Sequence, residues 1–138
     1  MSPDAKNDSL AERFTEAYNR LGSKALLAVE REVFGANVGV NGYTTIAQAD
    51  DLADRLGLHG GVRLLDVGAG QGWPGIYLSK KTGCHVVVTD LPVTGLRTAA
   101  TRARRQRLDR RSAVIQADGA RLPFRPRSFD AVVHTDVL

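Results

Sequence analysis

The chain has 138 residues, a formal net charge of +4 and ordinary fractions of hydrophobic (43%) and charged (25%) residues. This length accommodates one domain or part of one, and the composition excludes a disordered, collagen-like or disulfide-rich protein. The only cysteine, Cys84, excludes a multi-cysteine metal site within one chain, and no apolar run is long enough to span a membrane, so we expect a cytoplasmic protein with neither a metal nor a membrane partner.

The first 57 residues predict helices that lead into the main domain. Apolar residues recur every three or four positions, which is typical of an amphipathic helix or helix pair, at Leu10, Phe14, Ala17, Leu21, Ala25 and Val29. Residues 35–43 are rich in glycine and asparagine and predict a loop. Thr45 and Gln48 then fit a capping box at the start of a second helix, and Gly57 marks its end. We therefore expect an N-terminal helical lead-in over residues 1–57.

From residue 58 onward, short apolar runs alternate with helical patterns. The runs at 62–67, 84–90, 113–118 and 129–134 predict strands. A helix starting near Pro74 joins the first two strands, and an arginine-rich helix over roughly 93–109 joins the next two. Alternating strands and helices with continuous apolar strands predict an α/β, Rossmann-like three-layer sandwich with a mostly parallel sheet, preceded by the N-terminal helices.

Acidic side chains stand at the ends of three predicted strands. Asp66 lies near the end of the first strand, Asp90 ends the second and Asp118 ends the third. A glycine-rich turn over residues 68–72 follows the first strand. Since ligands of such sheets bind beyond the carboxyl ends of the strands, we expect the three carboxylates and the turn to form one nucleotide site.

Two classes of nucleotide fit this turn. Residues 70–75 match the G-x-G-x-x-G pattern of dinucleotide-binding proteins, which leaves an NAD-binding oxidoreductase as one reading. Asp66 argues against it, because its negative charge would repel a pyrophosphate. The same charge would attract the ammonium and sulfonium groups of S-adenosylmethionine.

Four segments, taken together, resemble class I S-adenosylmethionine-dependent methyltransferases. Residues 64–72 are similar to the first motif of that family, and residues 87–91, 116–124 and 128–136 are similar to its next three motifs, in the same order. The resemblance implies that residues 58–138 form a partial Rossmann-like cofactor-binding domain, truncated after the fourth strand. It also implies S-adenosyl-L-methionine as the cofactor and, from the type of lead-in, a small-molecule methyl acceptor.

The resemblance assigns most of the cofactor contacts to the first two strands. It implies that Asp66 orients the methionine amino group and that Asp90 accepts both ribose hydroxyls. Leu91 would pack on one face of the adenine. The turn residues that would pass under the methionine and ribose are Gly68, Ala69 and Gly70.

Further contacts implied by the resemblance lie elsewhere in the chain. Asp118 would bind the adenine amino group, with Gly119 and Ala120 beside the ring, and the backbone of His134 would meet the methionine ammonium. Tyr43 and Gln48 belong to a segment that would close over the cofactor. Structural alternatives stay open for four of these residues: Asp66 caps a turn, Asp90 caps a helix, Asp118 forms an Asx turn, or Tyr43 is an ordinary buried aromatic. No catalytic base stands out, and His134 is the only side chain placed near such a role.

Two further features bear on partners. Residues 97–111 contain seven arginines and one acid, which indicates a solvated outer helix or, alternatively, a patch for nucleic acid. The fourth strand would be a bare sheet edge with exposed valines, and such edges pair with other chains. We therefore expect a homodimer, a second chain covering this edge, or a catalytically impaired cofactor-binding fragment or interaction module.

Overall fold

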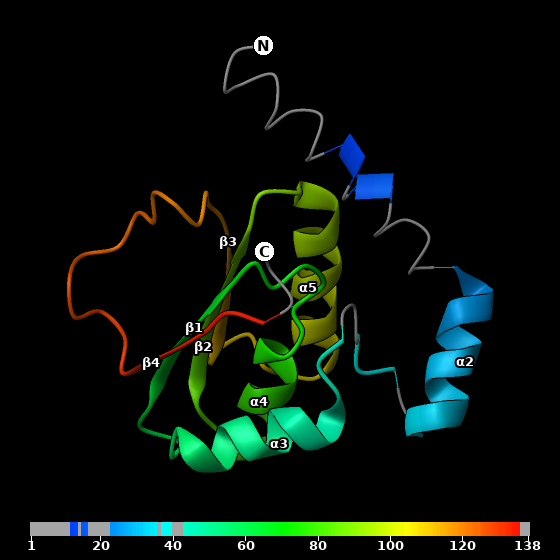
Figure 1. Ribbon diagram of the computed structural model, residues 1–138, viewed down its shortest axis with the longest axis horizontal. Coiled ribbons are helices and arrows are strands. Elements are labelled where there is room, and N and C mark those ends of the chain that lie inside the picture. Colours follow the sequence, from blue (N-terminus) through cyan, green and yellow to red (C-terminus); the bar gives the residue numbers. More distant parts are fainter. Residues whose placement is uncertain (1–11, 14, 17–22, 36, 40–42, 136–138) are drawn as a thin grey trace.

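The fold of residues 12–13, 15–16, 23–35, 37–39 and 43–135 is described by a computed structural model (Figure 1). Its centre is a parallel sheet of four strands in the order β3-β2-β1-β4. The strands are β1 (Arg63–Val67), β2 (His85–Asp90), β3 (Ser112–Gln116) and β4 (Ala131–Val133). All four predicted strands and the predicted parallel Rossmann-like α/β fold are confirmed.

Alternate residues of the strands build the core on one face of the sheet. Leu64 of β1 pairs in register with Val86 of β2, and both are buried with Val88 in the main hydrophobic cluster. The cluster is completed by small and branched side chains of the helices that cover this face, including Ile76, Leu78, Ala99 and Ala103. Burial of each such Leu or Ile side chain contributes roughly 1.5–3 kcal/mol, so this face carries most of the stability of the domain.

Helices α4 (Gly75–Thr82) and α5 (Val93–Arg105) pack on that face, and α3 (Ile46–Arg55) packs against α4 (Figure 1). The predicted capping box of α3 is present, and α4 ends at Gly83, which has a left-handed φ of 80°. The arginine-rich helix was predicted to reach residue 109 but ends at Arg105. The reason is local: Arg107 takes a φ of 58°, and the N–H of the buried Leu108 donates to the Ala103 carbonyl, which closes the helix end.

The N-terminal helix α2 (Lys24–Phe34) begins at the Ser23 cap and ends at Gly35. The predicted helix is present here, but its apolar residues Ala25 and Val29 are not buried: Ala25 is exposed and Val29 is 54% exposed. In Figure 1, α2 lies beside the layer of helices rather than between helices and sheet, so its apolar side chains do not reach the core. The earlier members of the predicted stripe lie outside the described residues.

The opposite face of the sheet carries the long segment between β3 and β4 instead of a helix (Figure 1). Phe124 and Phe129 of this segment pack edge to face, with ring centroids 5.0 Å apart. β4 is the outermost strand on its side of the described sheet, and Val132 on it is 56% exposed. None of the helices within the described ranges is long and apolar enough to cross a membrane.

Cys84, just before β2, is completely buried. Its carbonyl accepts a hydrogen bond from the hydroxyl of the buried Ser79 at 2.7 Å. Burial raises the pKa of the Cys84 thiol, so the group stays protonated and packs as a small hydrophobic side chain.

Candidate functional site

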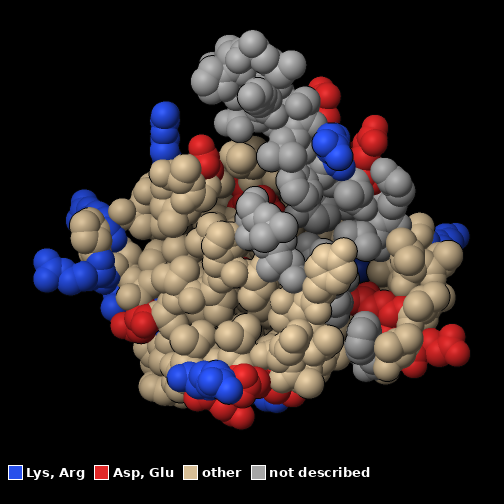
Figure 2. Space-filling model, viewed as in Figure 1, with Lys and Arg blue, Asp and Glu red and all other residues tan. Residues whose placement is uncertain are grey.

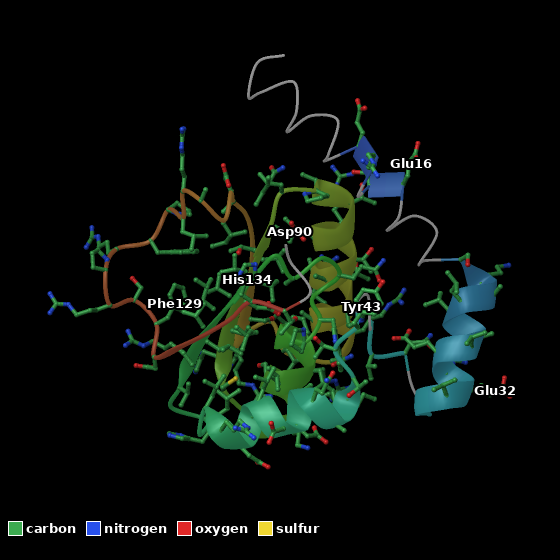
Figure 3. All side chains as sticks on the ribbon, viewed as in Figure 1. Glu16, Glu32, Tyr43, Asp90, Phe129 and His134 are labelled. Atoms are coloured by element: carbon green, nitrogen blue, oxygen red, sulfur yellow. The ribbon has the colours of Figure 1, made fainter. Side chains whose placement is uncertain are left out.

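The carboxyl ends of the parallel strands bring the predicted acids to one edge of the sheet. Asp66 lies in β1 opposite Val88 of β2, Asp90 ends β2, and Asp118 follows β3. His134 directly follows β4, so it belongs to the same edge, as Figure 3 shows for His134 and Asp90. The structure therefore gathers residues that are up to 68 positions apart in the printed sequence, from Asp66 to His134.

The glycine-rich turn between β1 and α4 is held against the end of β2 by its own backbone. The N–H groups of Gly68 and Ala69 both donate to the Thr89 carbonyl, at 2.8 and 2.9 Å. The next glycine, Gly70, donates its N–H to the Asp90 carboxylate at 2.8 Å. These three hydrogen bonds fix the backbone of the turn at the carboxyl end of β2 without any bound ligand.

Asp66 is a buried carboxylate with one oxygen unpartnered. Its Oδ2 accepts the N–H of Gly75 at the start of α4, at 2.8 Å, whereas its Oδ1 is buried and has no hydrogen-bond partner among the described residues. Burial raises the pKa of Asp66 well above its ordinary value, and the nearby Asp90 charge raises it further, although the Gly75 hydrogen bond acts in the opposite direction. The site therefore holds a carboxylate that a cation would stabilise.

The raised pKa makes the stability of the fold depend on pH. The folded chain keeps the Asp66 proton where the unfolded chain has already lost it, so this group's contribution is complete below about pH 4 and declines as pH rises through the folded pKa. We expect Asp66→Asn, which keeps an oxygen for the Gly75 N–H, to gain stability relative to the parent chain from pH 4 to 8. Because the Asp66 pKa is raised in the folded chain, the gain is expected to be small at pH 4 and larger at pH 8.

Urea unfolding at pH 4, 6 and 8 measures this effect. The exposed Asp109→Asn is the matched control, and its difference from the parent chain should not change with pH in this way. If the stability difference between Asp66→Asn and the parent chain is the same at all three pH values, the raised pKa of Asp66 is contradicted.

Asp90 is oriented by two backbone N–H groups. Its Oδ2 accepts from Gly70 and its Oδ1 accepts from Leu91, both at 2.8 Å. Each carboxylate oxygen can accept more than one hydrogen bond, so the group stays able to bind hydroxyl donors from a ligand. Leu91 is 37% exposed beside it and offers an apolar surface.

The third acid sits in a looser setting. The Oδ1 of Asp118 accepts the Ala120 N–H at 2.9 Å, which is the Asx turn that the sequence left open as an alternative. Gly119 and Ala120 are both exposed, and Gly119 lies close to the Val67 side chain at the end of β1. Residues 118–120 therefore lie at the exposed periphery of the site, whereas Asp66 lies in its buried part.

Tyr43 and Gln48 differ from the other candidates. Tyr43 is 94% exposed on the segment that leads into α3, so the alternative of a buried aromatic is wrong (Figure 3). The side chain of Gln48 accepts the Thr45 N–H at 2.9 Å in the capping box. The structure does not bring either side chain to the carboxylates; both lie on the lead-in.

Two contacts that tie neighbouring segments to the glycine turn were missed or only partly anticipated. The buried Trp73, which lies just before α4, donates its Nε1–H to the Thr44 carbonyl at 3.0 Å. The prediction of a fully solvated arginine helix is wrong for Arg102, whose Nη1 donates to the Gln71 carbonyl at 2.7 Å. Arg102 lies three residues after the buried Ala99, and this helical spacing was the signal in the sequence.

The other arginines of the 97–111 stretch lie on the surface of the molecule. In Figure 2 the described lysines and arginines on the visible face stand around its outline, with acidic residues interspersed. The remaining arginines of the 97–111 stretch are exposed or partly exposed. This distribution is that of a solvated surface, and a role in nucleic-acid binding stays a prediction.

Comparison with known proteins connects this geometry to a family. Residues 64–138, more than half of the chain, match the family model described as "Methyltransferase domain". Methyltransferase GfsG of Streptomyces halstedii is 35% identical over 83 residues, which cover 60% of this chain and 30% of that protein. Sterol 24-C-methyltransferase of Candida albicans is 32% identical over 93 residues, or 63% and 25% of the two chains.

Solved structures give the same result. The [4+2]-cyclase SpnF is similar at a TM-score of 0.59 and 32% identity, covering 62% of this chain and 32% of that one. A SAM-dependent methyltransferase from Geobacter sulfurreducens, solved with S-adenosyl-L-homocysteine, is similar at a TM-score of 0.50 and 26% identity, covering 54% and 30%. The chain spans about a third or less of the length of the curated relatives it matches.

Proposed function

Because the chain belongs to the methyltransferase-domain family, we propose that it forms the cofactor-binding core of an S-adenosylmethionine-dependent methyltransferase that acts on a small-molecule acceptor. The resemblance to class I methyltransferases found in the sequence is thereby confirmed at the level of the family. The observation that carries the proposal is the acidic pair at the sheet edge, Asp90 bound to Gly70 and Asp66 buried behind it.

The residues of the edge suit the chemistry of this cofactor. The Oδ1 of Asp66 is buried and has no partner among the described residues, and an ammonium beside it would favour the ionised form of the carboxyl. We infer that Asp66 holds the methionine end, directly or through water, while Asp90 accepts the ribose hydroxyls. When bound, the cofactor supplies a methyl group on a sulfonium.

The groups at the rim complete the proposed site. We assign Leu91 to one face of the adenine, Asp118 to its amino group, and the backbone of His134 to the methionine ammonium. Gly119 and Ala120 lie beside the ring, and Gly68, Ala69 and Gly70 pass beneath the methionine and ribose. Tyr43 and Gln48 are proposed to approach only when the lead-in closes.

Methyl transfer gains mainly from holding donor and acceptor in line at close range. The chain contributes to this by fixing the glycine turn in advance, through the bonds from Gly68 and Ala69 to Thr89. A base is needed only where the acceptor carries a proton, and no side chain is assigned to that role. A small-molecule acceptor is supported by the sterol methyltransferase among the relatives.

A cofactor-binding unit without methyl transfer is the second candidate. One observation favours it: the similar SpnF is named as a cyclase rather than a methyltransferase. A methyl-transfer assay with a panel of small acceptors separates the candidates. Transfer to any of them would reject the second candidate.

Calorimetry with S-adenosylhomocysteine and, separately, with NAD tests the proposal on the chain as it stands. We expect binding of S-adenosylhomocysteine and none of NAD, because the ammonium of the former would favour the ionised form of the Asp66 carboxyl and pair with it, whereas a pyrophosphate offers no cation. Binding of NAD alone would overturn the proposal in favour of a dinucleotide enzyme.

A further inference from the structure

One guanidinium connects separate parts of the chain near the proposed site. Arg102 stands on α5, and its Nη1 donates to the backbone carbonyl of Gln71, inside the glycine-rich turn, at 2.7 Å. Gln71 itself is 5% exposed, and the hydrogen bond from the half-buried Arg102 is partly shielded from water. Arg102 thus binds a carbonyl of the glycine-rich turn, while the neighbouring Gly70 N–H of the same turn binds Asp90.

The same guanidinium packs against the segment that follows α2. A Cβ added at Gly39 would fall 1.5 Å from Arg102 Nη1, so the guanidinium occupies the space that any larger residue at position 39 would need. Gly39 also takes a φ of 77°, which favours glycine. Gly39 therefore lies against the Arg102 side chain of α5.

A carboxylate of α2 completes the arrangement. Glu30 accepts the Gly39 N–H through its Oε1 at 2.5 Å, and its charge acts on Arg102. Burial lowers the pKa of Arg102 while Glu30 raises it, and the guanidinium remains charged. The path from α2 to the glycine turn therefore runs through Glu30, Gly39 and Arg102 to Gln71.

We propose that Arg102 is a positioning residue that couples the α2–Gly39 segment to the glycine-rich turn, so that cofactor binding and ordering of that segment favour each other. The proposal rests on the function proposed above. Arg102 does not touch the ligand and acts through the backbone of the turn. Because coupling between two sites is reciprocal, binding at the turn should protect the segment, and loosening the segment should weaken binding.

The test compares Arg102→Gln with Arg102→Lys and with Arg104→Gln, an exposed arginine on the same helix. Calorimetry with S-adenosylhomocysteine gives the affinity, and hydrogen exchange of residues 23–39 with and without this ligand gives the coupling. We expect about tenfold weaker binding and loss of ligand-induced protection in Arg102→Gln. Arg102→Lys should be intermediate, because it keeps the charge, and Arg104→Gln should match the parent chain.

The outcomes separate this proposal from the function on which it rests. If the parent chain does not bind S-adenosylhomocysteine, the proposed function fails. If the parent chain binds but Arg102→Gln retains both the affinity and the protection of residues 23–39, the coupling is overturned.

A second variant covers the case in which Arg102→Gln does not fold. Glu30→Gln keeps an oxygen for the Gly39 N–H and removes the charge that acts on Arg102, on a helix outside the core. We expect it to reduce the ligand-induced protection of the segment and to weaken binding severalfold. A folded Glu30→Gln with unchanged protection and affinity would overturn the coupling as well.

Discussion

Replacing Asp90 with asparagine is expected to weaken binding of S-adenosylhomocysteine by roughly ten- to hundredfold. The carboxylate accepts the N–H groups of Gly70 and Leu91 with its two oxygens, so the introduced side-chain amide would turn its NH₂ group toward one of these donors. The variant also loses a charged acceptor for the ribose hydroxyls. A hydrogen bond to a charged group is worth about 1.5–3 kcal/mol, which corresponds to this range of affinity. Calorimetry on the purified variant measures the change.

Asp109→Asn serves as the control, since Asp109 is an exposed carboxylate in the turn between α5 and β3, at the far end of that strand. It should bind like the parent chain. Thermal unfolding of both variants shows whether the fold is kept. An Asp90→Asn variant that is folded and binds as tightly as the parent chain would remove the ribose assignment.

Gly72→Ala is expected to destabilise the fold by about 2–5 kcal/mol. Two effects add at this position. A Cβ would lie 2.6 Å from Cγ1 of the buried Ile76 and 3.1 Å from the Ala99 Cβ, and such overpacking costs about 1–3 kcal/mol. Gly72 also has a φ of 92°, a left-handed conformation that costs other residues roughly 1–2 kcal/mol. Urea unfolding gives the total.

Gly57→Ala isolates the backbone contribution. Gly57 has a φ of 59°, and no neighbouring atom lies within 4 Å of the point where a Cβ would stand, so only the conformational cost of about 1–2 kcal/mol applies. The difference between the two variants therefore measures packing between the turn, α4 and α5. Equal destabilisation by both substitutions would show that this contact is not tight.

Local rules predicted the framework well. The capping box of α3 involves Thr45 and Gln48, which are close in sequence, and the same helix ends just before Gly57. Such local patterns can be recognised without knowledge of the fold. The gathering of Asp66 and Asp90 followed from topology alone, because parallel strands end at the same edge. These features depend on spacing and residue type rather than on packing.

Features set by tertiary packing were not predictable in the same way. The exposure of Val29 depends on where α2 sits, and the position of the Arg102 guanidinium depends on its contact with Gly39, more than sixty residues earlier in the chain. Likewise, the bond from Gly75 to Asp66 arises only when α4 docks on the sheet. The pairing of the β4 edge with a second chain stays a prediction.

The buried thiol of Cys84 has a practical consequence. It is the only sulfhydryl in the chain, and it sits at the start of a central strand under the Ser79 hydroxyl, protonated and shielded. An alkylating reagent can reach it only when β2 and α4 separate. The rate at which Cys84 is labelled therefore reports how often the strand that bears Asp90 opens, and how far an added ligand slows that opening.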